Sequence, residues 1–173
     1  MPLHLGYNTI HRRGFAKRPD TEKEREEKDL NTLEVAKLTL RDGGCTCVIA
    51  SEGKVVFTSK ERGVKPLLDY YREHGDAHKG AALADKVIGR AAALLAQLLG
   101  VGELYAGVMS EGALEELNKA GIHASYETKV EAIRNRDNTG FCPMEQLSKG
   151  VDDPREMLAR VEEFLAAGKG PRA

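Results

Sequence analysis

The chain has 173 residues, of which 41% are hydrophobic and 31% are charged, and its formal net charge is −1. This composition is that of one globular domain, and without a basic excess it argues against binding nucleic acid through charge. The sequence has no apolar run of about 18 residues and no signal-peptide pattern, so we expect no membrane span. The three cysteines lack disulfide-framework spacing, which favours a reducing compartment and predicts a cytoplasmic protein.

The sequence predicts a charged tail followed by one ordered domain. In the segment DTEKEREEKD, residues 20–29, every residue but one is charged, so it has no apolar face to bury. We therefore expect residues 1–28 to be disordered or weakly ordered. Residues 29–168 should form the domain, which ends in an amphipathic helix that begins at Asp153 and Pro154.

The first elements of the domain are a helix, a hairpin and a second helix. Leu33, Ala36 and Leu40 have the spacing of one helical face. The segments CTCVIA (45–50) and KVVFTS (54–59) flank a Ser-Glu-Gly turn and predict a β-hairpin. We expect Cys45 and Cys47 to pack on one face of the first strand as core residues. A helix with Pro66 in its first turn should follow and end before Gly75.

Strands and helices alternate in the next part of the chain. We expect a short strand at 81–84, a buried helix over 86–99 and a strand at 103–109. Ser110 should cap the next helix, and a strand at 122–126 should follow it. Residues 130–136 fit either a strand or a helix. This alternation after a hairpin predicts an α/β fold with a mixed sheet.

Two longer segments and three shorter ones carry a resemblance to known proteins. The order of elements, with the segments LYAGVMSEGALEELNKAGI (104–122) and ADKVIGRAAALL (84–95), resembles the cytidine-deaminase-like fold. More closely, ADKVIG, GVMSEGAL and NRDNTGFCPME resemble an uncharacterised bacterial family with that fold and no assigned activity. The resemblance covers about residues 31–150. It implies a three-layer α/β/α sandwich with a mixed sheet.

The zinc ligands of the deaminases are missing from the resembling segments. Glu111 and Leu114 stand where those enzymes have two cysteines, and Ala84 and Lys86 stand where they have His-x-Glu. Leucine cannot bind zinc, and a charged lysine cannot take a proton from a bound water. In the HGDAH segment, 74–78, a solvated loop is preferred to a metal site. We therefore expect no metal and no cofactor.

Asp85 and Lys86 are the first candidates for a functional site. At the expected start of the 86–99 helix, Asp85 suits an N-cap, whereas Lys86 in the first turn opposes the helix dipole. A lysine there is better explained if an anion lies beside it, either Asp85 itself or a ligand phosphate. Gly89 would let a ligand or the backbone approach closely. Because ligands of open α/β sheets bind at strand-to-helix junctions, Asp85, Lys86 and Gly89 are predicted to bind ligand.

Two further loops supply candidate ligand contacts. Ser59 and Arg62 follow the second hairpin strand, and the Arg62 guanidinium matches the geometry of a phosphate. An ordinary charged loop is the alternative for this segment. Ser110 either only caps its helix or contacts ligand at the position of the deaminase metal.

A polar turn precedes Cys142. Donors and acceptors gather around Gly140 and fit either a binding loop or a plain turn; they are Asn135, Arg136, Asp137 and Thr139. Cys142, followed by Pro143 and with Glu145 at the third helical position, suits a helix start. A structural helix start is the preferred interpretation, ahead of a thiol that contacts ligand and of a nucleophile. Cys142 is not a zinc ligand, because no second cysteine is placed to join it.

Together these residues favour a protein that binds a nucleotide-like anion without zinc. Lys86 and Arg62 would supply charge, Asp85 would contact a ribose or base edge, and loop 135–145 would close over the ligand. The alternatives are a zinc-independent transferase or hydrolase acting through Lys86 on a nucleotide-type substrate, and a non-catalytic interaction module. The formyl-transferring deaminase-like domains of purine synthesis resemble the transferase alternative, but they pair their lysine with a histidine, where this chain has Val87. The candidate catalytic residues are Asp85, Lys86 and Cys142. The sequence also allows a homo-oligomer.

Overall fold

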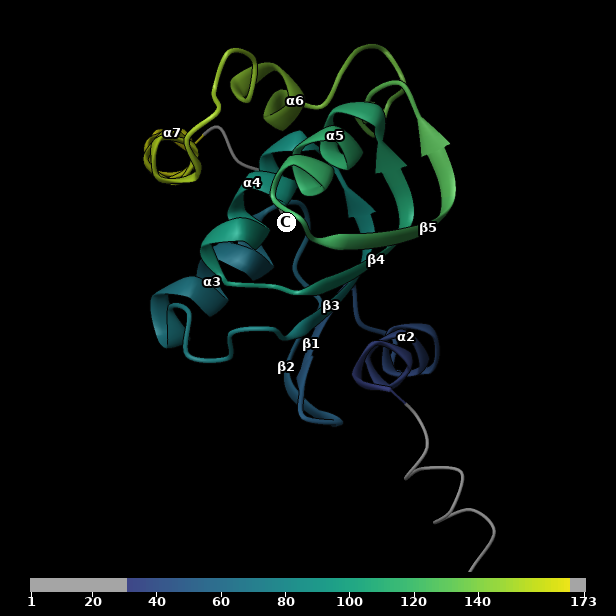
Figure 1. Cartoon of the computed structure of the whole chain (residues 1–173). Helices are drawn as coiled ribbons and strands as arrows, with labels where there is room; N and C mark the ends of the chain where they lie inside the picture. Colours follow the sequence, from purple (N-terminus) through teal and green to yellow (C-terminus); the bar gives the residue numbers. More distant parts are fainter. Residues whose placement is uncertain (1–30, 169–173) are drawn as a thin grey trace, which may run out of the picture.

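The computed structural model describes residues 31–168, so the predicted tail at 1–28 lies outside the described residues. Five strands form one mixed sheet in the order β2-β1-β3-β4-β5. Figure 1 shows the elements, which are α2 (Thr32–Asp42), β1 (Cys47–Ser51), β2 (Lys54–Ser59), α3 (Lys65–His74), β3 (Ala82–Ile88), α4 (Arg90–Leu98), β4 (Glu103–Ser110), α5 (Glu111–Lys119), β5 (His123–Val130), α6 (Pro143–Leu147) and α7 (Pro154–Ala166). Among residues 31–168, no helix has the length and apolarity needed to cross a bilayer.

The sheet combines an antiparallel hairpin with a parallel half. β1 pairs antiparallel with β2 and with β3, whereas β3, β4 and β5 run parallel. The predicted hairpin is confirmed, and its turn places Glu52 and Gly53 at positive φ, of 51° and 74°. The crossovers between the parallel strands are α4 and α5, as parallel pairing requires. The predicted α/β class with a mixed sheet is therefore confirmed.

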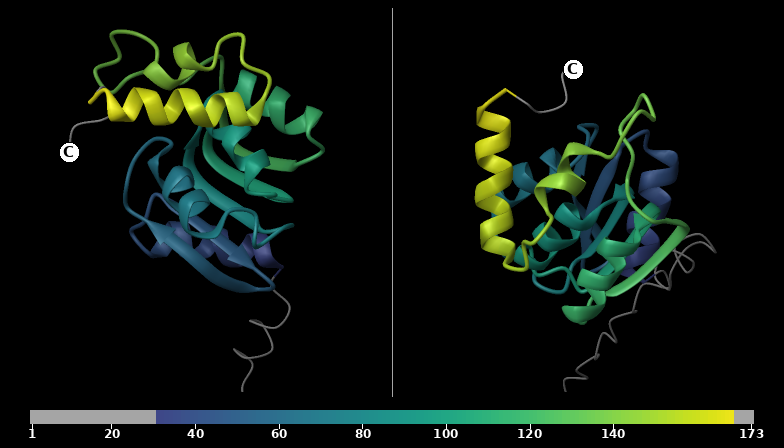
Figure 2. Two further views of the ribbon diagram at one scale, coloured as in Figure 1. Left: turned by 90° about the vertical axis from the view of Figure 1, so that its left-hand side faces the viewer. Right: turned by 90° about the horizontal axis from the view of Figure 1, so that it is seen from above.

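Helices lie on both faces of the sheet (Figures 1 and 2). α2 covers one face through a small apolar cluster, which consists of Ala36, Leu40, Cys45, Val48, Ala50 and Ala84. The larger core lies on the other face, between the sheet and α3, α4 and α5. α7 packs against α4 from outside, with Met157 and Val161 fully buried. The amphipathic final helix predicted from the sequence is thus present, and its apolar face packs on the larger core.

The helix ends follow the residues that the sequence offers as caps. The Ser110 hydroxyl accepts from the Ala113 N–H at 3.1 Å, and the Asp153 carboxylate accepts from the Arg155 N–H at 2.8 Å. Gly121 follows α5 at φ 71°, in the left-handed region that favours glycine. These predicted helix boundaries are confirmed.

The predicted helix over 86–99 is wrong in its first turn. Residues 85–88 belong to β3, and the helix α4 begins at Arg90 with Gly89 as N-cap. β3 lies between two partners: Asp85 pairs with Cys47 of β1 and with Ala106 of β4, and the parallel ladder continues through Val87 and Ile88. Asp85 is therefore not an N-cap, and Lys86 does not meet a helix dipole.

Two smaller expectations also change. Cys45 packs in the cluster under α2, whereas Cys47 lies in the larger core, so the two cysteines do not share a face. Cys45 precedes β1, where the chain is not yet held to the alternation of a strand. β5 extends to Val130, beyond the predicted 122–126, and residues 131–142 are irregular apart from one bridge between Arg134 and Phe141.

Candidate anion-binding groove

A groove of about 1020 Å³, here called the arginine groove, lies between segments far apart in the sequence. The loop from β2 to α3 and the start of α3 form one part of it, and the β5–α6 loop with the first residues of α6 forms another. The end of α7 completes the lining. The lining residues are Lys60, Glu61, Arg62, Gly63, Val64, Lys65, Leu68, Asp69, Arg72, Arg134, Asn135, Arg136, Cys142, Pro143, Met144, Phe164, Leu165 and Gly168.

Positive charge dominates the lining of the arginine groove. Six of its residues are lysine or arginine and only two are acidic. Two of the six are paired: Lys65 Nζ lies 2.6 Å from Asp69, and Arg72 lies 3.2 Å from Glu162 on α7. By contrast, within residues 31–168 no carboxylate lies at ion-pair distance from Arg62, Arg134 or Arg136. Arginines that line a groove without a carboxylate partner are suited to an anionic ligand.

The polar turn of residues 135–140 is ordered by its own side chains. The Asn135 side-chain oxygen accepts from the backbone N–H groups of Thr139 and Gly140, at 3.0 and 3.2 Å. The Asn135 amide also donates to the Thr139 hydroxyl at 3.0 Å. These bonds hold the turn that carries Arg136, and the neighbouring Arg134 guanidinium lies 5.6 Å from the centre of the Phe141 ring.

Cys142 lines the arginine groove and is half-buried. It is the N-cap of α6 and its side chain makes no capping hydrogen bond, as expected for a poor capping residue. Its backbone N–H donates to the Ile133 carbonyl at 2.8 Å, which ties α6 to the preceding loop. The helix start predicted at Cys142 is confirmed.

The structure separates the predicted site residues into two groups. Arg62, Asn135, Arg136 and Cys142 line the arginine groove, and the remaining predicted residues do not: Ser59, Asp85, Lys86, Gly89, Ser110, Asp137 and Thr139.

Three of the residues outside the groove have structural contacts that explain them. The Ser59 hydroxyl accepts from the Glu61 N–H at 3.1 Å and orders the loop that carries Arg62. Ser110 is fully buried as a helix cap. A Cβ at Gly89 would lie 2.8 Å from Glu145 Oε1, so the glycine admits this carboxylate of α6.

Asp85 is a buried carboxyl on the central strand, apart from the groove. It is 6% exposed and accepts a 2.9 Å hydrogen bond from the Val87 N–H. Burial raises the pKa of Asp85 to about 7, against the opposing effect of its backbone and Cys47 hydrogen bonds. Burial and the adjacent Asp85 raise the pKa of the Cys47 thiol. Cys47 therefore remains a protonated core residue.

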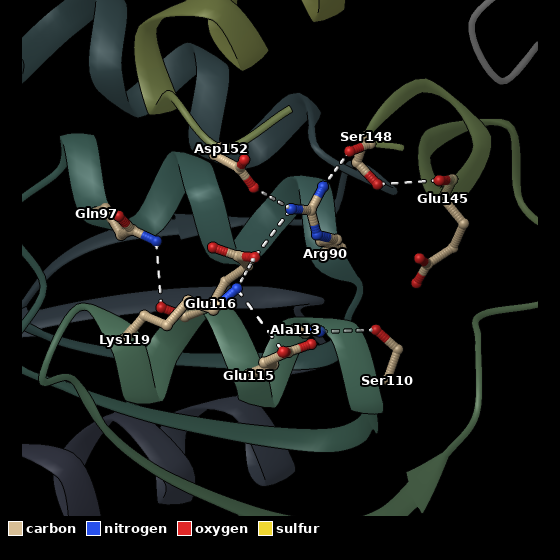
Figure 3. Close-up of polar contacts among 10 residues, drawn as sticks. All are labelled: Arg90, Gln97, Ser110, Ala113, Glu115, Glu116, Lys119, Glu145, Ser148 and Asp152. Atoms are coloured by element: carbon tan, nitrogen blue, oxygen red, sulfur yellow. Dashed lines mark hydrogen bonds and ion pairs between the residues drawn. The ribbon is translucent and has the colours of Figure 1, made fainter. Parts of the chain in front are cut away.

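A second polar cluster, centred on Arg90, was missed by the sequence interpretation (Figure 3). The Arg90 guanidinium lies 2.9 Å from Glu116 and 3.0 Å from Asp152, and it donates to the Ser148 carbonyl. Glu116 is only 4% exposed and also pairs with Lys119 at 3.1 Å. The cluster ties α4, α5 and the α6–α7 loop together. The one feature of the sequence that could have pointed to this cluster is Glu116, which stands beside Leu117 on the inward face of α5.

Fold and groove together define an α/β protein with a five-stranded mixed sheet and a cationic groove of ligand-binding size. The chain belongs to the family described as TM1506, domain of unknown function (DUF1893), whose model matches residues 35–165. It is similar to a crystal structure of a DUF1893 family protein (TM1506) from Thermotoga maritima, with 25% sequence identity and a TM-score of 0.71. That similarity covers 91% of this chain and 99% of the other. No curated protein matches the chain.

These comparisons confirm the sequence-based resemblance to an uncharacterised family, and they supply no activity.

Proposed function

We propose that the protein binds a nucleotide-like anion in the arginine groove. One observation carries this proposal: Arg62, Arg134 and Arg136 come from two separate loops and line the same groove, with no carboxylate of residues 31–168 at ion-pair distance from any of them. The oxygens of one phosphate can accept two parallel hydrogen bonds from one guanidinium. Three arginines therefore suit a phosphorylated ligand better than an anion with a single charge.

The remaining lining supports an organic ligand rather than free phosphate. Apolar residues also line the groove and are here called its apolar wall; they are Val64, Leu68, Met144, Phe164 and Leu165. A volume of about 1020 Å³ is at the upper end of the range for small-molecule sites, roughly 300–1,000 Å³. A base or sugar could lie against the apolar wall while its phosphates meet the arginines, and Asn135 and Cys142 line the same groove.

The arrangement of the elements supports a finer description of the fold. With α2 on one face of the sheet and α3, α4 and α5 on the other, we propose a three-layer α/β/α sandwich of the cytidine-deaminase-like kind. The overlay of His-x-Glu on Ala84 and Lys86 does not hold, because those residues lie in β3. We propose a zinc-free protein on other grounds: within residues 31–168, no three His, Cys, Asp or Glu side chains are arranged to hold a metal ion.

The alternative of a transferase or hydrolase acting through Lys86 requires that lysine beside the bound anion. Lys86 is exposed on β3 and does not line the arginine groove. Asp85 is buried and does not line the groove either, whereas Cys142 does line it. The geometry therefore supports binding, and a reaction at Lys86 has no observation in its favour.

A thermal-shift panel tests the proposed ligand class. The full chain would be heated with adenosine, AMP, ADP, ATP or pyrophosphate, because a ligand that binds only the folded state raises the melting temperature. We expect the nucleotides to raise it more than adenosine or pyrophosphate alone, since charge and apolar surface both contribute. The shift should disappear in Arg62→Ala and Arg136→Ala and persist in Arg41→Ala, whose guanidinium pairs with Asp42 on α2. Equal shifts in all three variants would rule out the arginine groove.

A further inference from the structure

β5 leaves a long strand edge without a partner in the described part of the chain. Seven of its eight residues pair with β4, in one constant parallel register that runs from His123 to Val130. On its other side no strand of residues 31–168 is hydrogen-bonded to it, because β5 is the last strand of the sheet. Figure 1 shows β5 at the outer edge of the sheet. Such an edge is a template for pairing with another chain.

The opposite edge of the sheet is built differently. The register of β1 with β2 shifts between Ile49 and Ala50, which pair with Phe57 and Val55 and leave Val56 as an extra residue in β2. Bulges of this kind twist an edge strand and prevent pairing. β5 has no such irregularity and no proline, and its Tyr126 is 40% exposed. Only one of the two edges is therefore suited to edge-to-edge pairing.

The sequence of β5 is complementary to itself when two copies run antiparallel. With Thr128 opposite Thr128 of a second copy, Glu127 falls opposite Lys129 and Lys129 opposite Glu127, while Tyr126 meets Val130. Directly opposed residues of antiparallel strands lie on one face with Cβ atoms about 4.5–5.5 Å apart, close enough for both ion pairs to form. A two-fold axis through Thr128 generates both pairs at once, as an isologous interface requires.

The two charged side chains are accessible for this role. Lys129 has 43% of its side chain exposed and lies 3.5 Å from Glu111, so it is held near the strand end without being buried. Glu127 is exposed and accepts a hydrogen bond from the Tyr105 hydroxyl, which orients its carboxylate on the sheet. We infer that the β5 edge is the interface between two copies of this chain, paired antiparallel about Thr128 into one continuous ten-stranded sheet.

Charge reversal on β5 tests this interface. In Lys129→Glu, four carboxylates would line the shared face, and in Glu127→Lys, four ammonium groups would do so. Each variant should raise the dimer Kd by roughly tenfold or more, because two attractive pairs become repulsive. The double variant Glu127→Lys/Lys129→Glu restores both pairs in swapped positions and should return the Kd to near the wild-type value. Sedimentation equilibrium of the full chain measures each Kd.

Mixing the two single variants provides a sharper arm of the experiment. A chain with two glutamates and a chain with two lysines have opposite charges along the β5 edge, so an equimolar mixture should form heterodimers even though neither variant pairs well with itself. Lys54→Glu on the β2 edge is the matched control and should leave the Kd unchanged. A wild-type chain that stays monomeric at its highest soluble concentration would overturn the inference. So would a dimer whose Kd is the same in Lys129→Glu, or single variants that do not associate with each other.

Discussion

The carbonyl oxygen of Lys86 lies directly against Gly107 of the neighbouring strand. A Cβ on residue 107 would be 2.9 Å from that oxygen, closer than real Cβ atoms approach. The two residues face each other across the parallel ladder of β3 and β4, between the pairs Asp85–Ala106 and Val87–Val108. Because the contact is with backbone, no side-chain rotation can relieve it. The close approach of the two backbones therefore holds Lys86 in the strand β3.

This contact predicts that Gly107→Ala destabilises the fold by about 1–3 kcal/mol, the usual cost of inserting an extra methyl group into a packed site. Gly140→Ala is the matched control, because the nearest atom to a Cβ there is 3.9 Å away. The control substitution should leave stability unchanged or raise it slightly, because alanine gives the unfolded chain fewer conformations than glycine does. Urea unfolding of both variants measures the difference. Equal stabilities would mean that β3 and β4 are not as close at this point.

Asp85 should give the protein a pH-dependent stability. Burial raises its pKa to about 7 from an ordinary value of 3.8, so the folded state holds this proton over a range where the unfolded state has lost it. The stabilisation is complete below about pH 4 and is lost as the pH rises through about 7. A pKa difference of one between the folded and unfolded states is worth about 1.4 kcal/mol. The free energy of unfolding should therefore fall by on the order of 4 kcal/mol across this pH range.

Asp85→Asn should remove this dependence. Asparagine still accepts the Val87 N–H hydrogen bond, so the variant should equal or exceed the wild type in stability at pH 8 and lose that advantage at pH 5. The difference in unfolding free energy between the two proteins, measured from pH 4 to pH 8, isolates Asp85 from the histidines, which both proteins share. A difference that does not change with pH would show that Asp85 titrates normally.

Glu116 should matter far more to stability than the adjacent Glu115. Glu116 is nearly buried against Arg90, whereas Glu115 has 69% of its side chain exposed and lies 3.8 Å from Lys119. Removing one partner of a buried pair leaves the other charge uncompensated, so Glu116→Ala should cost about 3 kcal/mol. Glu115→Ala should cost about 0.5 kcal/mol or less. Denaturant unfolding distinguishes the two, and similar losses would mean that the Arg90 cluster is open to water.

Local signals explain how much of the fold could be predicted from the sequence. The hairpin turn at Glu52 and Gly53 and the caps at Ser110 and Asp153 depend on residues within a few positions of each other, and all were found where expected. The sequence predicts a helix over residues 86–88, with Asp85 as its N-cap, because Val87 and Ile88 continue the helical spacing of α4. The strand conformation of this segment comes from pairing with β1 on one side and β4 on the other, which no local pattern encodes.

The candidate site was predicted in part for the same reason. Arg62, Asn135, Arg136 and Cys142 stood out as polar or reactive residues in loops, and the structure brings them to one groove. Its apolar wall was missed, because Phe164 and Leu165 reach the groove only through the packing of α7. The Arg90 cluster was missed as well, since its partners come from α5 and the α6–α7 loop, at least 26 residues away in sequence.

The central claim, a nucleotide-like anion in the arginine groove, is tested most directly by calorimetric titration of ATP into the wild-type chain and into Arg62→Ala/Arg136→Ala. If both guanidinium groups contact phosphate, the double variant should bind roughly 100-fold more weakly or worse, at about 1.5–3 kcal/mol for each charged hydrogen-bond partner. Arg41→Ala should bind like the wild type, and its unfolding curve should match that of the double variant. Wild-type affinity in the double variant, or no ATP binding by the wild-type chain, would contradict the account.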